Sequence, residues 1–269
     1  PINARYKAQE LAYVIENADI SLIITHDKIS EYVDFGQLLN EALANDRPAK
    51  LQHLVMLGEP ASGFVTEAAF NTSGENINWD TIDDLRLGVS VRAPAIMMYT
   101  SGTTANPKGC PLNHEVLVRN GINMNRSRYF LGDTDRFWAP LPMFHMAAIL
   151  PLICCMDAGA AMLSMTHVDP GESLAMMEKE KVTVAFPSFP TITQALINHQ
   201  NFKQTDLSSL RRINNVAPPD VLRQFQEAFP QAVQTGAYGL TEAGGVIAFN
   251  HPEETLQQRL ETCGKPMPG

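Results

Sequence analysis

A short run of hydroxyl, glycine and lysine residues is the part of the sequence best suited to bind phosphate. Residues 99–109 have the sequence Tyr-Thr-Ser-Gly-Thr-Thr-Ala-Asn-Pro-Lys-Gly. Small residues leave backbone N–H groups accessible to an anion, Ser101, Thr103 and Thr104 add hydroxyl donors, and Lys108 adds a positive charge. The run is not a Walker A loop, because that loop ends in Gly-Lys-Ser/Thr and here the lysine precedes a glycine. Composition alone supports two interpretations about equally: a polyphosphate-binding loop and a solvated turn.

A second pattern combines an aromatic ring with a hydroxyl and a carboxylate. Residues 237–244 have the sequence Ala-Tyr-Gly-Leu-Thr-Glu-Ala-Gly. A carboxylate such as that of Glu242 is the ligand type that Mg²⁺ prefers, and the ring of Tyr238 can cover the face of a purine base. Taken by itself, such a string is more often a turn that precedes a strand. Its interpretation therefore depends on the run at 99–109.

The elements that must position these residues indicate an α/β protein with sheets flanked by helices, because short apolar runs alternate with amphipathic stretches. We expect strands at residues 21–25, 52–57, 95–99, 137–139, 161–163, 182–186, 213–216 and 233–235. We expect helices at residues 10–16, from 113 onward with Asn113 as N-cap, and at 146–157, 172–180, 191–200 and 219–229. About residues 58–92 we expect a loop or linker, since the segment turns polar and Gly/Ser-rich. The run at 99–109 would follow a buried strand, where α/β sheets place their ligands.

Composition excludes several classes of protein. With 269 residues, 45% of them apolar and 18% charged, the chain can bury a core and is not disordered. A net charge of −9 gives no general attraction to nucleic acid or anionic lipid, so any bound polyphosphate needs local positive charge. The four cysteines form no zinc-ligand spacing and suit a reducing cytoplasm. The most apolar stretch, 146–156, is about half the ~20 residues of a membrane span, so we expect a core helix there.

The run at 99–109 resembles the phosphate-binding signature of the adenylate-forming superfamily, whose usual form is Thr-Ser-Gly-Thr-Thr-Gly-x-Pro-Lys-Gly. That superfamily includes acyl-CoA synthetases, firefly-type luciferases and peptide-synthetase adenylation domains. Ala105 stands where the family usually has glycine, and its Cβ would cost about 1–2 kcal/mol in a left-handed backbone. Residues 237–244 are similar to the family's Tyr-Gly-x-Thr-Glu motif. In that motif the tyrosine lies against adenine, the threonine meets the α-phosphate and the glutamate holds Mg²⁺.

Two weaker segments agree with this resemblance. Residues 214–219, Asn-Asn-Val-Ala-Pro-Pro, stand where the family has its Gly-Gly-Ala-Pro adenine-side turn. Residues 141–145, Leu-Pro-Met-Phe-His, resemble the segment that lines the acyl tunnel, with His145 as its gate. Without that context, a lone histidine is normally a surface or core residue. Amino-acid-activating relatives usually carry aspartate at this position to pair with an α-ammonium group, which an imidazole cannot do.

The resemblance covers nearly the whole chain and implies an AMP-forming acid–thiol ligase closest to acyl-CoA synthetases. It would activate a fatty or other carboxylic acid that lacks an α-amine, with ATP and Mg²⁺ as cofactors and coenzyme A as co-substrate. The catalytic residues that it implies are Thr241, Glu242, Lys108 and His145, with Glu242 as the metal ligand. The nucleotide-binding residues that it implies are Thr100, Ser101, Gly102, Thr103, Thr104, Lys108, Val216, Ala217, Pro218, Gly236, Ala237, Tyr238, Gly239 and Thr241. Candidates for the acyl pocket are Ala147, Ala148, Phe189, Gly244 and Gly245.

The resemblance also implies a fold and an extent. Residues 1–269 would be a truncated AMP-binding domain, the central part of the large N-terminal domain of the adenylate-forming fold, with the C-terminal small domain absent. We therefore expect this piece alone to be nearly inactive. Three alternatives stay open: a kinase-type phosphotransferase, a non-catalytic nucleotide-binding fragment, and a luciferase-like oxygenase on the same fold. The sequence identifies neither the acid nor the oligomeric state.

Overall fold

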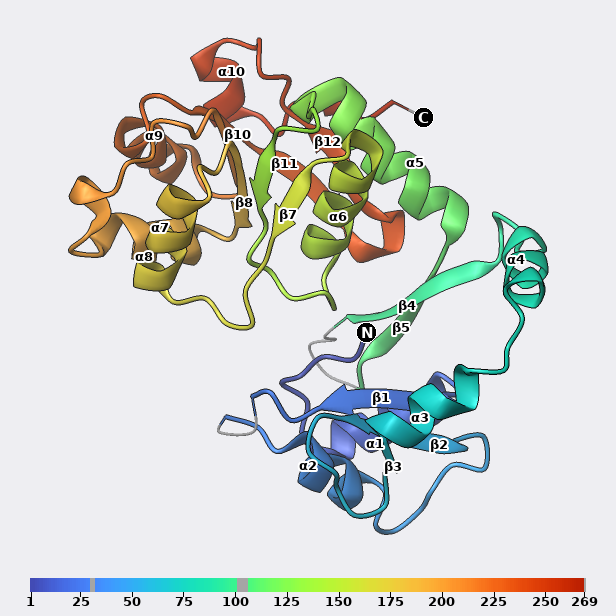
Figure 1. Cartoon of the computed structure of the whole chain (residues 1–269). Coiled ribbons are helices and arrows are strands. Elements are labelled where there is room, and N and C mark those ends of the chain that lie inside the picture. Colours follow the sequence, from blue (N-terminus) through green and yellow to red (C-terminus); the bar gives the residue numbers. More distant parts are fainter. Residues whose placement is uncertain (30–31, 101–105, 269) are drawn as a thin grey trace. The chain divides into compact units, whose positions relative to one another are not determined.

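The computed structural model of this protein describes residues 1–29, 32–100 and 106–268. The chain forms two compact units, a smaller one of Ile2–Pro111 and a larger one of Leu112–Gly269 together with Pro1. Each unit combines sheets with flanking helices, which confirms the predicted α/β class (Figure 1). That residues 1–269 form one truncated domain stays a prediction.

The smaller unit is built around a three-stranded parallel sheet. Its strands are β1 (Leu22–His26), β2 (His53–Leu57) and β3 (Val65–Thr66), in the order β1-β2-β3. Two helices, α1 (Ala8–Asn17) and α2 (Phe35–Ala42), contribute to the same core. Helix α1 buries Leu11, Val14 and Ile15, whose spacing of three and four residues places them on one face. The predicted helix at 10–16 and the strands at 21–25 and 52–57 are therefore confirmed.

The segment about 58–92 contains more regular structure than the expected loop or linker. It holds β3 and two short helices, α3 (Glu67–Gly74) and α4 (Trp79–Leu87). Each helix begins at a capping side chain: the Thr66 hydroxyl accepts from the Ala69 N–H, and Asn78 Oδ1 accepts from the Asp80 N–H. Neither helix has a buried residue. The polar composition therefore correctly indicated that this segment is not buried. The helices were not predicted, because Thr66 and Asn78 were not recognised as N-caps.

A two-stranded sheet flanks the run at 99–109. It consists of β4 (Pro94–Thr100) and β5 (Lys108–Asn113). The expectation of a buried strand at 95–99 is wrong in part, because Met98 is the one buried residue of β4. Lys108 begins a strand and does not lie in a loop that leads straight into a helix. The intervening residues 101–105 lie outside the described residues.

The main sheet of the larger unit has five parallel strands in the order β10-β9-β8-β6-β7. These strands are β6 (Arg136–Trp138), β7 (Ala161–Leu163), β8 (Val184–Ser188), β9 (Arg212–Asn215) and β10 (Val233–Thr235). The helices between them are α6 (Met146–Ala158), α7 (Pro170–Lys179), α8 (Pro190–Asn198) and α9 (Pro219–Ala228), with a 3₁₀ turn at Phe202–Gln204. Parallel strands need such crossover connections. All five strands and all four helices were predicted within a few residues.

A second sheet of the larger unit is antiparallel. Its strands are β11 (Ala237–Leu240), β12 (Gly245–Phe249) and β13 (Lys265–Pro266), and α10 (Leu256–Glu261) lies between the last two in sequence. A 3₁₀ turn, Thr241–Ala243, joins β11 to β12. Helix α5 (His114–Met124) begins where expected, since Asn113 Oδ1 accepts a 2.8 Å hydrogen bond from the Val116 N–H. A π-helical turn, Asn125–Tyr129, continues it.

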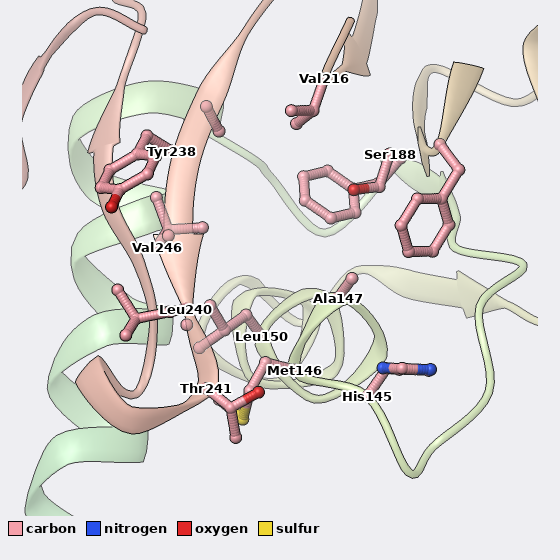
Figure 2. Close-up of a pocket in the computed structure, with 15 residues that line it drawn as sticks. His145, Met146, Ala147, Leu150, Ser188, Val216, Tyr238, Leu240, Thr241 and Val246 are labelled. Atoms are coloured by element: carbon pink, nitrogen blue, oxygen red, sulfur yellow. The ribbon is translucent and has the colours of Figure 1, made fainter. Parts of the chain in front are cut away.

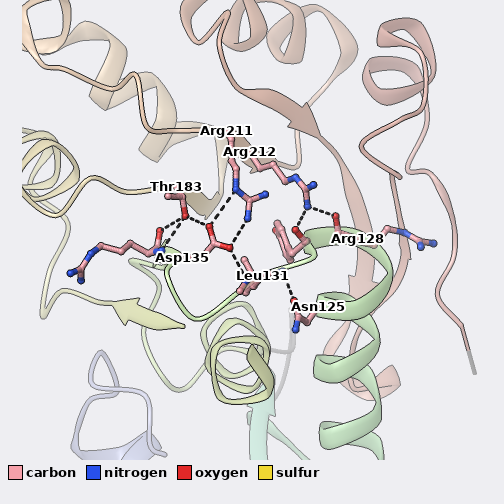
Figure 3. Close-up of polar contacts among 10 residues, drawn as sticks. Asn125, Arg128, Leu131, Asp135, Thr183, Arg211 and Arg212 are labelled. Carbon is pink, nitrogen blue, oxygen red and sulfur yellow. Dashed lines mark hydrogen bonds and ion pairs between the residues drawn. The ribbon is translucent and has the colours of Figure 1, made fainter. Parts of the chain in front are cut away.

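The end of that π-helical turn is stabilised by an arginine from the main sheet. Phe130 follows the turn in a left-handed conformation with φ of 49°. Arg212 Nη1 donates to the Arg128 carbonyl at 2.8 Å and also to the Tyr129 carbonyl (Figure 3). A cation at the last carbonyls of a helix interacts favourably with the helix dipole. The contact therefore ties the end of the α5 segment to β9.

One carboxylate next to β6 is held by several donors. Asp135 accepts hydrogen bonds from Thr183 Oγ1 at 2.6 Å and from Arg211 Nη2 at 2.7 Å (Figure 3). The Gly132 N–H donates to the same carboxylate at 2.9 Å. Burial opposes the charged form of Asp135, but these hydrogen bonds and the charge of Arg211 favour it, and the pKa of Asp135 is lowered. The group therefore favours the fold in its ionised form.

Candidate active site

A cavity of about 330 Å³ lies within the larger unit. It is bounded by the start of α6, the ends of β8 and β9, and the hairpin of β11 and β12. Tyr238, Leu240 and Val246 lie along the hairpin, while Val216 and Ser188 face them from the ends of β9 and β8 (Figure 2). The carboxyl ends of parallel strands are where open α/β sheets place their ligands.

The Tyr238 side of the cavity has the surfaces that a flat ring needs. The side chain of Tyr238 is 56% exposed and that of Val216 is 48% exposed, and both line the cavity. The hairpin register shifts between Tyr238 and Gly239, which is a β-bulge. A Cβ at Gly239 would lie 1.9 Å from the Gly245 carbonyl oxygen, so no side chain fits there. The bulge and this glycine together fix where the ring of Tyr238 points.

Thr241 and Glu242 follow β11 directly, in the 3₁₀ turn. The turn is closed by a 2.9 Å hydrogen bond from the Gly244 N–H to the Thr241 carbonyl. Thr241 lines the cavity, whereas the Glu242 side chain is exposed next to it in sequence. The described residues contain no group of three or more metal-ligating side chains. A single carboxylate still suits Mg²⁺, which is usually bound by one or two carboxylates together with substrate phosphates and water.

The α6 side of the cavity is apolar. Met146, Leu150 and Phe186 form this wall, and Leu150 is 1% exposed. Gly245 allows the wall to approach the hairpin, because a Cβ there would lie 2.5 Å from Leu150 Cδ1. His145 stands at the start of α6, and its ring centroid lies 6.5 Å from that of Phe189. The arrangement suits a ligand with an apolar part next to a polar one.

The structure brings together six of the predicted site residues around this cavity. The cavity is lined by His145, Val216, Ala237, Tyr238, Gly239 and Thr241. Ala217 and Gly236 line a separate hollow of about 150 Å³, which also touches Val216 and Ala237. Pro218 is exposed and lines neither hollow. The expected adenine-side residues are thus divided between two neighbouring hollows.

The remaining predicted residues belong to the smaller unit. Thr100 ends β4 and is half-buried, and Lys108 begins β5 and is exposed. Ser101, Gly102, Thr103 and Thr104 lie outside the described residues. The roles of these residues stay predictions.

Several cavity residues were not predicted from the sequence. Of the suggested acyl-pocket residues, Ala147, Phe189 and Gly245 line the cavity, whereas Ala148 and Gly244 are buried and do not. The lining residues that were missed are Met146, Leu150, Phe186, Ser188, Leu240 and Val246. Met146 and Leu150 are four residues apart, so helical spacing could have suggested one from the other. No local signal indicates those on β8 and β12, because their positions depend on long-range strand pairing.

Comparison with known proteins identifies the family. The sequence profile described as "AMP-binding enzyme" matches residues 1–269, and the chain belongs to this family of adenylate-forming enzymes, close to acyl-CoA synthetases. It is 29% identical over 286 residues to YngI of Bacillus subtilis, whose name carries a provisional assignment as an acyl-CoA synthetase. It is 28% identical over 274 residues to 4-coumarate–CoA ligase 3 of Arabidopsis thaliana. These matches cover 99% and 97% of this chain but 51% and 46% of the relatives, so the chain spans about half their length.

The fold agrees with a solved structure of the same superfamily. The luciferase-like enzyme of the Zophobas morio mealworm superposes with a TM-score of 0.79 at 20% identity, over 99% of this chain and 60% of that one. This similarity confirms the predicted fold, the N-terminal domain of adenylate-forming enzymes. Within the described parts of the chain, no helix combines the length and apolar character needed to cross a bilayer.

Proposed function

We propose that this chain forms part of an AMP-forming acid–thiol ligase that activates a carboxylic acid lacking an α-amine. The acid would become an acyl-adenylate, and coenzyme A would then take the acyl group as a thioester. The observation that supports this most directly is one cavity lined both by Tyr238 and Thr241 and by the apolar side chains of Met146 and Leu150. An acyl-adenylate has the same two parts, a nucleotide and an acyl group.

The residues of the hairpin fit ATP and Mg²⁺. The exposed ring of Tyr238 would cover one face of the adenine, and the Thr241 hydroxyl would donate to the α-phosphate. The Glu242 carboxylate would hold Mg²⁺, which neutralises phosphate charge when it is bound. Lys108, with residues 101–104, would contact the leaving β- and γ-phosphates. The chain has a net charge of −9, so these local groups must supply the positive field.

The lining of the cavity supports an acid without an α-ammonium group. Among the described residues that line it, none is aspartate, glutamate, lysine or arginine. A buried ammonium group would lack a carboxylate partner there, which is costly. His145 occupies the position at which amino-acid-activating relatives carry aspartate. Fatty and aromatic acids meet the apolar wall without this cost.

The test is ATP–pyrophosphate exchange by the complete protein that contains this chain, with short, medium, long, aromatic and α-amino acids. We expect exchange with at least one acid that lacks an amine, AMP as the nucleotide product, and thioester formation when coenzyme A is added. Exchange with amino acids alone would contradict the substrate assignment. Formation of ADP would favour a phosphotransferase, and light emission with a luciferin and oxygen would favour the luciferase-like alternative.

A further inference from the structure

The turn that contains Thr241 and Glu242 is held by a side chain from another element. Asn120 lies on α5, and its Nδ2 donates to the carbonyl oxygens of Gly244 and Val246, each at 3.0 Å. An asparagine amide nitrogen has two N–H groups, so both are used. The two carbonyls stand on either side of Gly245. Asn120 therefore fixes the backbone directly after the turn.

This part of the backbone has unusual conformational freedom. Gly244 has φ of 76° and Gly245 has φ of 110°, both in the region that favours glycine. Two consecutive glycines restrict the chain least, so an anchor from outside the hairpin is needed to hold one conformation. Val116, one helical turn before Asn120, supplies a second contact: a Cβ at Gly244 would lie 2.2 Å from its Cγ1. Helix α5 thus holds the segment at two successive turns, by packing and by hydrogen bonds.

Packing alone does not explain an asparagine at this position. Among the described residues, Asn120 Oδ1 is buried without a hydrogen-bond partner. Leaving a buried amide oxygen unpaired is unfavourable, and an apolar side chain of similar shape would avoid that cost. The two donated hydrogen bonds are the contribution that a leucine could not make. They act on the hairpin and not on α5 itself.

We propose that Asn120 is a positioning residue for Thr241 and Glu242. By holding the Gly244 and Val246 carbonyls, it determines where the turn presents the hydroxyl and the carboxylate to the nucleotide and its metal ion. The proposal rests on the proposed function for the roles of those two groups. Asn120 itself does not line the cavity, so it acts only through the hairpin.

The variant that tests this is Asn120→Leu, which keeps the number and branching of the side-chain heavy atoms, removes both donors and also removes the unpaired oxygen. Asn123→Leu is the matched control on the same helix. Asn123 Nδ2 also donates to a distant carbonyl, that of Pro268 at 2.6 Å, but it does not contact the hairpin turn. Three quantities are measured for both variants in the complete protein: the melting temperature, amide hydrogen exchange at residues 241–246, and the Mg²⁺ concentration for half-maximal pyrophosphate exchange.

We expect Asn120→Leu to raise the exchange rate of the Gly244 amide on the order of tenfold, the factor that corresponds to about one net hydrogen bond. The Mg²⁺ midpoint should rise about fivefold or more, by the same reasoning, while KM for the acid stays unchanged. Asn123→Leu should match the wild type in both readouts, whatever its melting temperature. If Asn120→Leu unfolds the protein, Asn120→Ser in the same assays replaces it, since a small hydroxyl side chain adds no bulk.

Comparison with Glu242→Gln separates this proposal from the proposed function. If Glu242→Gln raises the Mg²⁺ midpoint and Asn120→Leu does not, the positioning role is wrong and the metal ligand stands. If neither variant raises it, the metal role of Glu242 fails and the positioning role fails with it. Unchanged hydrogen exchange at 241–246 in Asn120→Leu would also overturn the proposal, because the hairpin would then be held without the two hydrogen bonds.

Discussion

Leu150 allows the proposed acyl wall to be tested against simple loss of core packing. Its side chain is 1% exposed, packs against the hairpin at Gly245 and lines the cavity. Leu150→Ala removes three carbon atoms and should cost about 2–5 kcal/mol of folding stability. If the space joins the acyl pocket, it should admit up to about three more methylene groups of the acid. Each buried methylene contributes about 0.8 kcal/mol. In Leu150→Ala, kcat/KM should therefore rise roughly fourfold for each carbon by which the acid is longer than the best wild-type substrate.

The assay is kcat/KM for a homologous series of straight-chain acids, measured by pyrophosphate release in the complete protein. Leu174→Ala is the matched control, because Leu174 is also 1% exposed but belongs to the core cluster of the main sheet and does not line the cavity. We expect similar losses in melting temperature for the two variants and a shift toward longer acids for Leu150→Ala alone. If both variants keep the wild-type chain-length profile, the wall at Leu150 does not contact the acid and the acyl assignment of this cavity is refuted.

Four further outcomes follow from the site and from the ion pair between Asp135 and Arg211. Glu242→Gln should lower the rate of adenylation, and added Mg²⁺ should partly restore it, whereas Lys108→Ala should lower the rate without being rescued by Mg²⁺. Pyrophosphate exchange measured over a Mg²⁺ series checks both variants. If Mg²⁺ rescues Lys108→Ala instead, the two roles are reversed. His145→Ala should raise KM for the acid much more than KM for ATP, and equal changes in both constants would favour a core role. Because the pKa of Asp135 is lowered in the folded state, its ionised carboxylate stabilises the fold at pH values above its unfolded-state pKa of about 3.9. This stabilisation is lost as the pH falls through the folded-state pKa. Melting curves from pH 7 to pH 3 should therefore show that the stability difference between wild type and Asp135→Asn shrinks in acid, and a constant difference would contradict this.

Much of the fold could be predicted because its strongest signals are local. The main sheet alternates short strands with helices along the chain, and all five strands agree with their predicted ranges within a few residues. Strand β11 was missed, because residues 237–244 were interpreted as a functional motif or as a turn that precedes a strand, and their first four residues form a strand themselves. The strand β5 was missed because it contains Gly109 and Pro111, which are unfavourable within strands.

The candidate site was predictable where a motif carries it and not where distant segments meet. The strings around His145 and Tyr238 named residues that the structure places around one cavity. The contact of Asn120 with the Gly244 carbonyl joins residues 124 positions apart, and no periodicity or propensity encodes such a pairing. The division of the adenine-side residues between two hollows likewise depends on how the segment after β9 approaches the start of β11, which single-segment patterns do not contain.

The hairpin of β11 and β12 contributes to both sides of the cavity. Tyr238 and Thr241 stand at the proposed nucleotide side, and Gly245 approaches Leu150 of the apolar wall. A turn of three residues joins the two strands. A ligand that restricts the motion of this hairpin lowers the entropy that the second ligand has to remove. In the proposed function, acid and nucleotide would therefore be linked through one element. Such linkage is reciprocal: the factor by which the acid tightens ATP binding would equal the factor by which ATP tightens binding of the acid.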